Sequence, residues 1–175
     1  MMGHTAETLV RAPVSTGIIR TMDLRDLITP ESIIPALKVK SKKQALQELA
    51  DKAATLTGAN ARQIFESLLQ RERLGSTGVG RGIAIPHGKI GDIKQIFTLF
   101  ARLEEKVDFE SMDGEPVDLI FLLLAPESAG ADHLKALARI SRLLRDPAAI
   151  EKLRGSKDRA ALYSVLTEPL ASHAA

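Results

Sequence analysis

The spacing of hydrophobic residues predicts helices in both halves of the chain. Apolar side chains recur every three or four positions at residues 131–146, as on a helix with one buried face. The same spacing places Ile64, Leu68 and Leu69 on the buried face of a helix that begins after Asn60. Further helices are predicted at 23–28 (a single turn), from Ser41 to Gly58, from Asp146-Pro147 to Gly155, and at 157–168.

The remaining apolar segments have the pattern of strands. Residues 95–103 and 117–125 are almost continuously apolar, which is typical of strands buried on both faces. Residues 32–39 contain Pro35 and therefore fit an edge strand or an extended segment. Residues 75–91 hold six glycines in seventeen positions, which predicts short extended pieces separated by turns. Together the elements predict one α/β domain with helices on both sides of a central sheet.

Composition narrows the classes of function. A chain of 175 residues is long enough for one domain with a real core. Aromatic residues make up only 3%, which counts against single-stranded nucleic-acid binding by base stacking. A net charge of +2 is weak evidence for any polyanionic partner. The absence of cysteine excludes disulfides, thiolate catalysis and cysteine-ligated metal.

Hydropathy also bears on location and on domain boundaries. The longest wholly apolar run, residues 119–125, is too short to span a bilayer, and the N-terminus lacks the pattern of a secretion signal. We therefore predict a cytoplasmic protein. Residues 1–21 are interpreted as a flexible extension, 22–169 as the domain and 170–175 as a tail.

A histidine stands at the end of a short apolar run in "GIAIPHGK", residues 82–89. Pro86 fixes its own φ and disfavours a helical Ile85, so the run should end at a defined angle. His87 then projects from a stiff point, where a neutral imidazole is a competent nucleophile. Gly88 would let the backbone of another molecule approach closely. A turn histidine without a chemical role is the alternative.

A second histidine, His133, lies one turn into the strongest predicted helix, on its apolar face. The first turn of a helix disfavours a charged imidazolium and favours a nearby anion, so a neutral His133 could donate a hydrogen bond beside an anion site. A core histidine bonded to a backbone carbonyl explains the pattern equally well.

Polar residues between the second predicted helix and the glycine-rich segment could also bind an anion. Arg71 and Arg73 end that helix, where cations are favourable whatever their chemistry. Ser76 and Thr77 could bind a phosphate or could simply form the turn. The residues alone do not decide between these roles.

Three segments together resemble the enzyme IIA domains of the bacterial phosphoenolpyruvate-dependent phosphotransferase system. They read "RERLGSTGVGRGIAIPHGK" (71–89), "VDLIFLLLAP" (117–126) and "HLKALARISRLL" (133–144). The resemblance is to the fructose–mannitol type, above all its nitrogen-regulatory branch, and runs from about Met22 to Glu168. It implies a mixed β-sheet sandwiched between helices.

The resemblance also implies a chemistry. In such a domain His87 would accept a phosphoryl group at Nε2 from a histidine phosphocarrier protein. His133 would lie beside the phosphorylated ring, and Arg71 would stabilise the phosphate. Arginine suits this role because its planar guanidinium matches phosphate oxygens. The protein would be a phosphoryl carrier rather than a turnover enzyme, with no cofactor and no metal.

Several partners and alternatives follow. Without cysteine or a membrane span the chain cannot phosphorylate a sugar by itself. It either regulates target proteins, related to potassium transport or sensor kinases in the resembled branch, or donates to a separate IIB chain. Neither nucleic acid nor membrane insertion is expected, and a weak homodimer is left open. We expect Ile83 and Ile90 to give an apolar docking surface around the site.

Two further hypotheses belong to other classes. One is a metal-binding protein that uses His87 and His133, although two histidines without a clear third ligand make a poor zinc site. The other is an interaction module in which the histidines serve structure alone.

Overall fold

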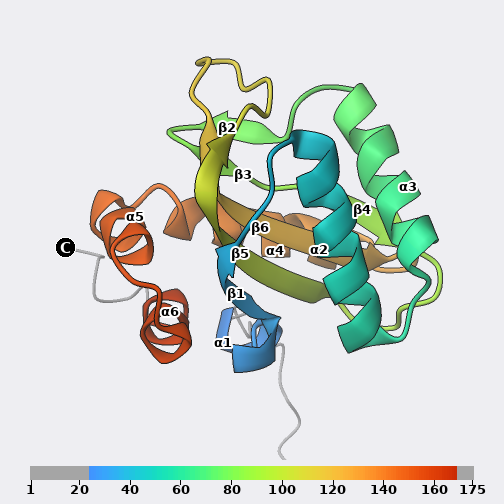
Figure 1. Cartoon of the computed structure of the whole chain (residues 1–175). Helices are drawn as coiled ribbons and strands as arrows, with labels where there is room; N and C mark the ends of the chain where they lie inside the picture. The colour runs from blue at the N-terminus through green and yellow to red at the C-terminus, as the bar shows by residue number, and fades with distance from the viewer. Residues whose placement is uncertain (1–23, 169–175) are drawn as a thin grey trace, which may run out of the picture.

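The computed structural model describes residues 24–168, which form a six-stranded sheet with helices on both faces (Figure 1). The strands are β1 (Ile33–Leu37), β2 (Gly78–Gly80), β3 (Ile83–Ala84), β4 (His87–Ile90), β5 (Phe97–Val107) and β6 (Val117–Pro126). The helices are α1 (Leu24–Leu27), the 3₁₀ turn η1 (Pro30–Ser32), α2 (Lys42–Thr57), α3 (Ala61–Arg73), α4 (Ala131–Leu143), α5 (Pro147–Arg154) and α6 (Arg159–Leu166). The predicted extension at 1–21 and tail at 170–175 lie outside the described residues.

The sheet is mixed, with the long strands β5 and β6 antiparallel at its centre. Its order is β1-β5-β6-β3-β2, and β4 also pairs with β6. Strands β3 and β4 both run parallel to β6, one after the other along the same edge. Strand β1 pairs only with β5, in parallel, and so forms the edge strand that Pro35 predicts.

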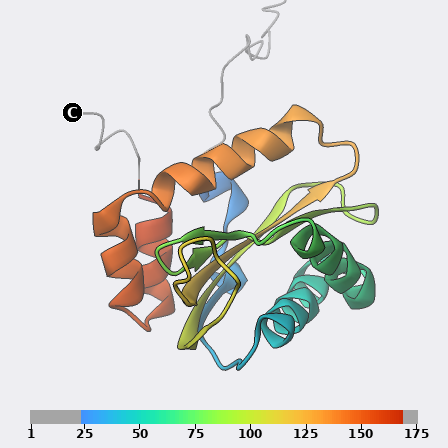
Figure 2. The ribbon, with the colours of Figure 1, turned by 90° about the horizontal axis from the view of Figure 1, so that it is seen from above.

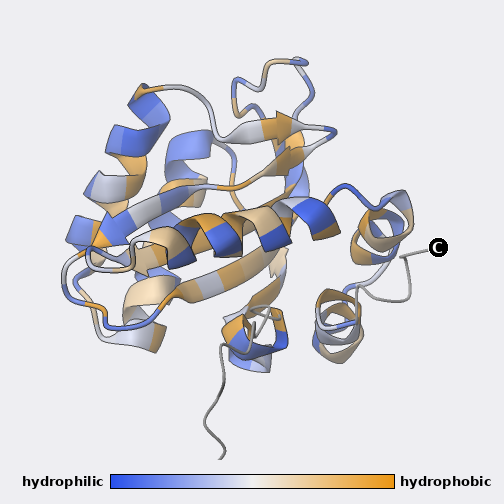
Figure 3. Cartoon of the chain, turned by 180° about the vertical axis from the view of Figure 1, so that it is seen from behind, coloured by the Kyte–Doolittle hydropathy of each residue, from blue (hydrophilic) through white to orange (hydrophobic). Residues whose placement is uncertain are grey.

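Helices cover both faces of the sheet because side chains of β6 alternate between two cores. Ile120, Leu122 and Leu124 face α2 and α3. Leu119, Phe121 and Leu123 face α1, α4, α5 and α6. Figure 2 shows the sheet edge-on between the two layers. Seen from behind, α4 crosses its face of the sheet, and hydrophilic and hydrophobic stretches alternate along it (Figure 3). The predicted mixed sheet between helices is confirmed.

Local capping fixes where the helices begin. Ser41 Oγ accepts the Gln44 N–H at 3.1 Å at the start of α2, and Gln44 Oε1 accepts the N–H of Lys40 at 2.8 Å. Asn60 Oδ1 caps α3 in the same way, through the N–H of Gln63.

Helix α4 ends at Leu143 and is therefore shorter than the predicted 131–146. Within residues 24–168, no helix combines the length and apolar character that crossing a membrane requires.

The segment around Pro86 differs from the expectation in one respect. The sequence predicts that the strand ends at Pro86, but a further strand, β4, begins at His87, which pairs with Leu123. Proline lacks an N–H but keeps its carbonyl, and Pro86 accepts the N–H of Leu123 at 3.0 Å. The pairing with β6 therefore continues past the proline, and His87 projects from the sheet itself.

Candidate functional site

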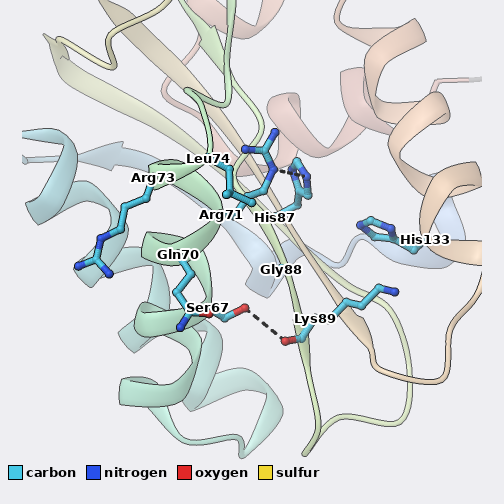
Figure 4. Close-up of a pocket in the computed structure, with 9 residues that line it drawn as sticks. All are labelled: Ser67, Gln70, Arg71, Arg73, Leu74, His87, Gly88, Lys89 and His133. Carbon is cyan, nitrogen blue, oxygen red and sulfur yellow. Dashed lines mark hydrogen bonds between the residues drawn. The ribbon is translucent and has the colours of Figure 1, made fainter.

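Three separate elements bring the predicted site residues together (Figure 4). Arg71 comes from the last turn of α3, His87 from the start of β4 and His133 from the first turn of α4. They line an open cavity of about 660 Å³. Its lining consists of Ser67, Gln70, Arg71, Arg73, Leu74, His87, Gly88, Lys89 and His133.

Both ring nitrogens of His87 have a partner, and the partners define the tautomer. Nδ1 lies 2.9 Å from the carbonyl oxygen of Ile85, which can only accept a hydrogen bond. Nε2 lies 3.1 Å from Nε of Arg71, which can only donate. Therefore the proton of the neutral ring sits on Nδ1, and Nε2 carries the lone pair toward the cavity. Nε2 is therefore the ring nitrogen that can act as a nucleophile toward a ligand in the cavity.

Arg71 is anchored by backbone as well as by His87. Its Nη1 donates to the carbonyl oxygen of Gly75 at 2.9 Å, in the turn that follows α3. The guanidinium is thus held at the mouth of the cavity with donors left over. Such a group can bind phosphate oxygens, since each of its N–H bonds donates.

His133 faces His87 across the cavity, with ring centroids 5.8 Å apart. Burial lowers the pKa of His133 below its ordinary value, and the nearby charges of His87 and Lys89 lower it further. The ring is therefore neutral at neutral pH. Its Nε2 is buried and has no hydrogen-bond partner among residues 24–168, so it can serve a ligand that enters the cavity. The unpartnered Nε2 gives no support to the alternative of a core histidine bonded to a backbone carbonyl.

The sequence did not single out several residues of the cavity. Lys89 is two positions after His87, and strand alternation puts both on one face of β4. Its ammonium extends toward His133 (Figure 4). Leu74 stands at the rim with 86% of its surface exposed, and Leu134, next to His133, is 65% exposed. The alternation could have indicated Lys89, but the exposure of the leucines depends on how α3 and α4 pack.

Three expectations about neighbouring residues are corrected. Ile83 and Ile90 are 2% and 3% exposed, so they belong to the core and form no docking surface. They are buried because β3 and β4 lie against β6 between helix layers. Gly88 makes room for α3 rather than for another molecule, since a Cβ there would lie 2.5 Å from Ser67 Oγ.

The hydroxyls after α3 form the turn and do not reach into the cavity. Ser76 Oγ donates to the carbonyl of Phe109, and Thr77 Oγ1 donates to Glu72 at 2.6 Å. Arg73 lines the cavity beside Arg71 but makes no contact with His87. As for a metal, no group of three or more potential His, Cys, Asp or Glu ligands occurs within the described part of the chain.

Comparison with known proteins decides the family. Residues 26–168 match the model of the phosphoenolpyruvate-dependent sugar phosphotransferase system, EIIA 2. The chain belongs to this EIIA type 2 family. The predicted resemblance is thereby confirmed over nearly all of the described residues.

Relatives of this EIIA protein include several nitrogen regulatory proteins. The nitrogen regulatory protein of Bradyrhizobium diazoefficiens is 67% identical over 153 residues, covering 87% of this chain and all of that protein. The one from Escherichia coli (strain K12) is 35% identical and covers 85% of this chain and 91% of its own length. The chain falls in the nitrogen regulatory branch of the family, as its sequence predicts.

Solved structures agree on the fold. The nitrogen regulatory protein IIA-Ntr of Neisseria meningitidis has a TM-score of 0.78 and 34% identity, over 82% of this chain and 99% of that one. A complex of enzyme IIAMTL with phosphorylated enzyme IIBMTL from Escherichia coli matches with a TM-score of 0.70, over 81% and 98%. At 20% identity, that second match concerns the fold alone.

Proposed function

We propose that this EIIA protein accepts a phosphoryl group on Nε2 of His87 from an HPr-like histidine phosphocarrier protein, and regulates partner proteins according to that state. The observation that carries the proposal is the tautomer of His87. A bonded Nδ1–H at Ile85 leaves the Nε2 lone pair facing an open, cation-lined cavity.

Transfer is an in-line displacement at phosphorus. The P–N bond of the donor phosphohistidine breaks, and the donor ring keeps the electron pair. The Nε2 lone pair of His87 forms the new P–N bond, so the Arg71 N–H that occupies it must move away. In its new position it can donate to the phosphoryl oxygens. The Ile85 carbonyl stabilises the positive charge that develops on the His87 ring.

His133 and Lys89 complete the environment of the phosphoryl group in this proposal. The neutral ring of His133 offers its buried Nε2 to the incoming oxygens if its proton sits there. Both side chains line the same cavity as His87. Their contributions are electrostatic, which is the main form of catalysis that phosphoryl transfer allows.

The surroundings of the cavity favour a protein as donor and as target. His87 is half-buried in an open cavity, and the exposed Leu74 is part of the cavity lining. Leu134, which follows the cavity residue His133 in the sequence, is also exposed. A phosphoryl group adds a charge of about −1.5 to −2, by analogy with hydroxyl phosphates. This charge would disturb an apolar interface fitted to the neutral ring, or attract one that presents an arginine.

Targets related to potassium transport or to sensor kinases follow from the resemblance and belong to the proposal. Phosphoryl donation to a separate IIB chain is the second candidate. The match to the family model of a sugar phosphotransferase system favours it. A cytoplasmic location and a weak homodimer stay predictions.

The test begins with phosphorylation. Wild-type protein and His87→Ala are incubated with phosphoenolpyruvate, enzyme I and the phosphocarrier protein, and intact masses are recorded. We expect one phosphoryl group on the wild type, lost in mild acid as P–N bonds are, and none on the variant. A variant that gains the group as fast as the wild type contradicts the assignment of His87.

Regulation is tested by capture from native lysate. Unphosphorylated, phosphorylated and His87→Ala proteins are compared for their bound partners. Partners that change with the phosphoryl group support regulation. Equal capture by all three contradicts it, and transfer from the phosphorylated protein to a IIB chain then identifies a simple carrier.

A further inference from the structure

A buried carboxylate lies directly behind the site. Glu72, the residue after Arg71, is only 7% exposed. Its Oε1 accepts the N–H of Thr77 at 2.7 Å, and its Oε2 accepts the Thr77 hydroxyl at 2.6 Å. The ammonium of Lys42 reaches Oε1 at 3.0 Å. That same ammonium lies 5.4 Å from the ring centroid of Phe109 and donates to its carbonyl at 3.4 Å.

These contacts close the turn between α3 and β2. Both donors of Thr77 bind the side chain of Glu72, the last buried residue of α3. The chain must therefore reverse its direction over residues 73–76. The turn is completed by the Leu74 N–H to the Arg71 carbonyl and the Gly75 N–H to the Glu72 carbonyl, each at 3.2 Å.

The closed turn presents one acceptor to Arg71. The Gly75 carbonyl lies 2.9 Å from Nη1 of Arg71, and Nε of the same guanidinium lies 3.1 Å from Nε2 of His87. The Glu72 carboxylate is therefore linked to Nε2 of His87 by its two hydrogen bonds to Thr77, by the covalent backbone from Thr77 back to Gly75, and by the two hydrogen bonds of Arg71. An arginine without such an anchor would lose more side-chain entropy when it orders on a ligand.

Stability alone explains the charged cluster poorly. Burying a carboxylate and an ammonium costs desolvation energy that their attraction often fails to recover, and apolar side chains of similar size pack as well or better. The cluster does place the end of α3, the start of α2 and the loop at Phe109 in one fixed arrangement. The cluster can therefore orient the side chain of Arg71, the residue directly before Glu72.

We propose that Glu72 is a positioning residue for phosphoryl transfer, because it holds the turn that directs the Arg71 guanidinium at Nε2 of His87. The inference rests on the proposed function of His87. It assigns Glu72 no contact with the phosphoryl group, so its effect on the rate must pass through Arg71.

A double-mutant cycle tests this dependence. Glu72→Gln, Arg71→Ala and the double variant are phosphorylated by phosphoramidate, a small donor that needs no protein docking. We expect Glu72→Gln to slow transfer about tenfold, since a charge-assisted contact is misplaced. In the Arg71→Ala background the same change should have no further effect. Equal slowing in both backgrounds overturns the proposal.

A matched control separates positioning from general destabilisation. Asp118→Asn removes another largely buried carboxylate, paired with Arg154 at 3.0 Å and outside the cavity. It should lower stability without changing the transfer rate. If Asp118→Asn slows transfer as much as Glu72→Gln, the effect is not specific. Should Glu72→Gln fail to fold, Thr77→Val, which removes only the 2.6 Å bond, replaces it in the cycle.

A second measurement needs no phosphorylation. The Nε–H of Arg71 should give a slowly exchanging NMR signal in the wild type because it is bonded to His87. In Glu72→Gln it should shift and exchange faster, whereas in Asp118→Asn it should not. A signal unchanged by Glu72→Gln overturns positioning. A wild type that takes no phosphoryl group contradicts the proposed function, and the NMR result still decides the role of Glu72.

Discussion

Gly88 offers a sharp test of how β4 is seated against α3. An added Cβ would lie 2.5 Å from Ser67 Oγ, 3.4 Å from its Cβ and 3.7 Å from its carbonyl carbon. Only the first distance is a severe clash, and rotating the Ser67 hydroxyl would relieve it. That rotation gives up the 3.3 Å bond from Ser67 Oγ to the Lys89 carbonyl. The Cβ therefore costs about 1–1.5 kcal/mol in either case, as overpacking if the hydroxyl stays or as a lost hydrogen bond if it rotates.

The expected free energies follow from these distances. Gly→Ala also reduces the entropy of the unfolded chain, which stabilises by about 0.5 kcal/mol where the backbone permits it. Gly88→Ala should therefore lower the free energy of unfolding by about 0.5–1 kcal/mol in the wild type. In a Ser67→Ala background the clash is absent, and the same change should raise it by about 0.5 kcal/mol.

Urea unfolding followed by far-UV circular dichroism measures both values, since the chain has no tryptophan and one tyrosine. The essential outcome is that the effect of Gly88→Ala on the free energy of unfolding changes sign between the two backgrounds. The corresponding coupling energy between positions 67 and 88 is about 1–1.5 kcal/mol. If Gly88→Ala destabilises both backgrounds equally, Ser67 is not what the glycine accommodates, and the account of β4 is wrong.

Three other expectations follow from the structure. His133 binds its proton less readily in the folded than in the unfolded protein, so the free energy of unfolding should fall as the pH drops through the ordinary pKa of 6.5. His133→Asn should reduce this dependence of stability on pH, as measured by unfolding curves at several pH values. A phosphoryl dianion on His87 opposes the positive charges that lower this pKa, and an NMR titration should show it raised. Arg81 has a left-handed φ of 57°, so Arg81→Gly should stabilise by about 0.5 kcal/mol, and a loss of stability in urea would contradict this.

Local signals in the sequence predicted the elements well where a few neighbouring residues decide the conformation. The caps at Ser41 and Asn60 are of this kind, because each side chain binds a backbone N–H three positions later. The edge position of β1 also follows from one residue, Pro35. In such places hydrogen bonds between near neighbours in the sequence decide the conformation, and no distant contact is needed.

The features missed by the sequence depend on packing between distant segments. His87 continues a strand because β6, more than thirty residues later, offers it a partner. Ile83 and Ile90 look like any apolar residue near a loop, and only the parallel pairing with β6 places them inside. The site itself joins α3, β4 and α4. Local patterns marked Arg71, His87 and His133 as candidates, but only the resemblance joined them in one site, because no local pattern encodes their proximity.

The two hydrogen bonds on the ring of His87 also determine which isomer of phosphohistidine can form. In an unfolded chain both imidazole nitrogens are open to a small phosphoryl donor, and a mixture of isomers results. In the folded protein the Ile85 carbonyl holds a proton on Nδ1, and only Nε2 faces the cavity. In the proposed relay every donor would therefore meet the same nitrogen, and every acceptor would receive the group from the same bond. A main-chain oxygen two residues before His87 would in this way fix the regiochemistry of the proposed transfer.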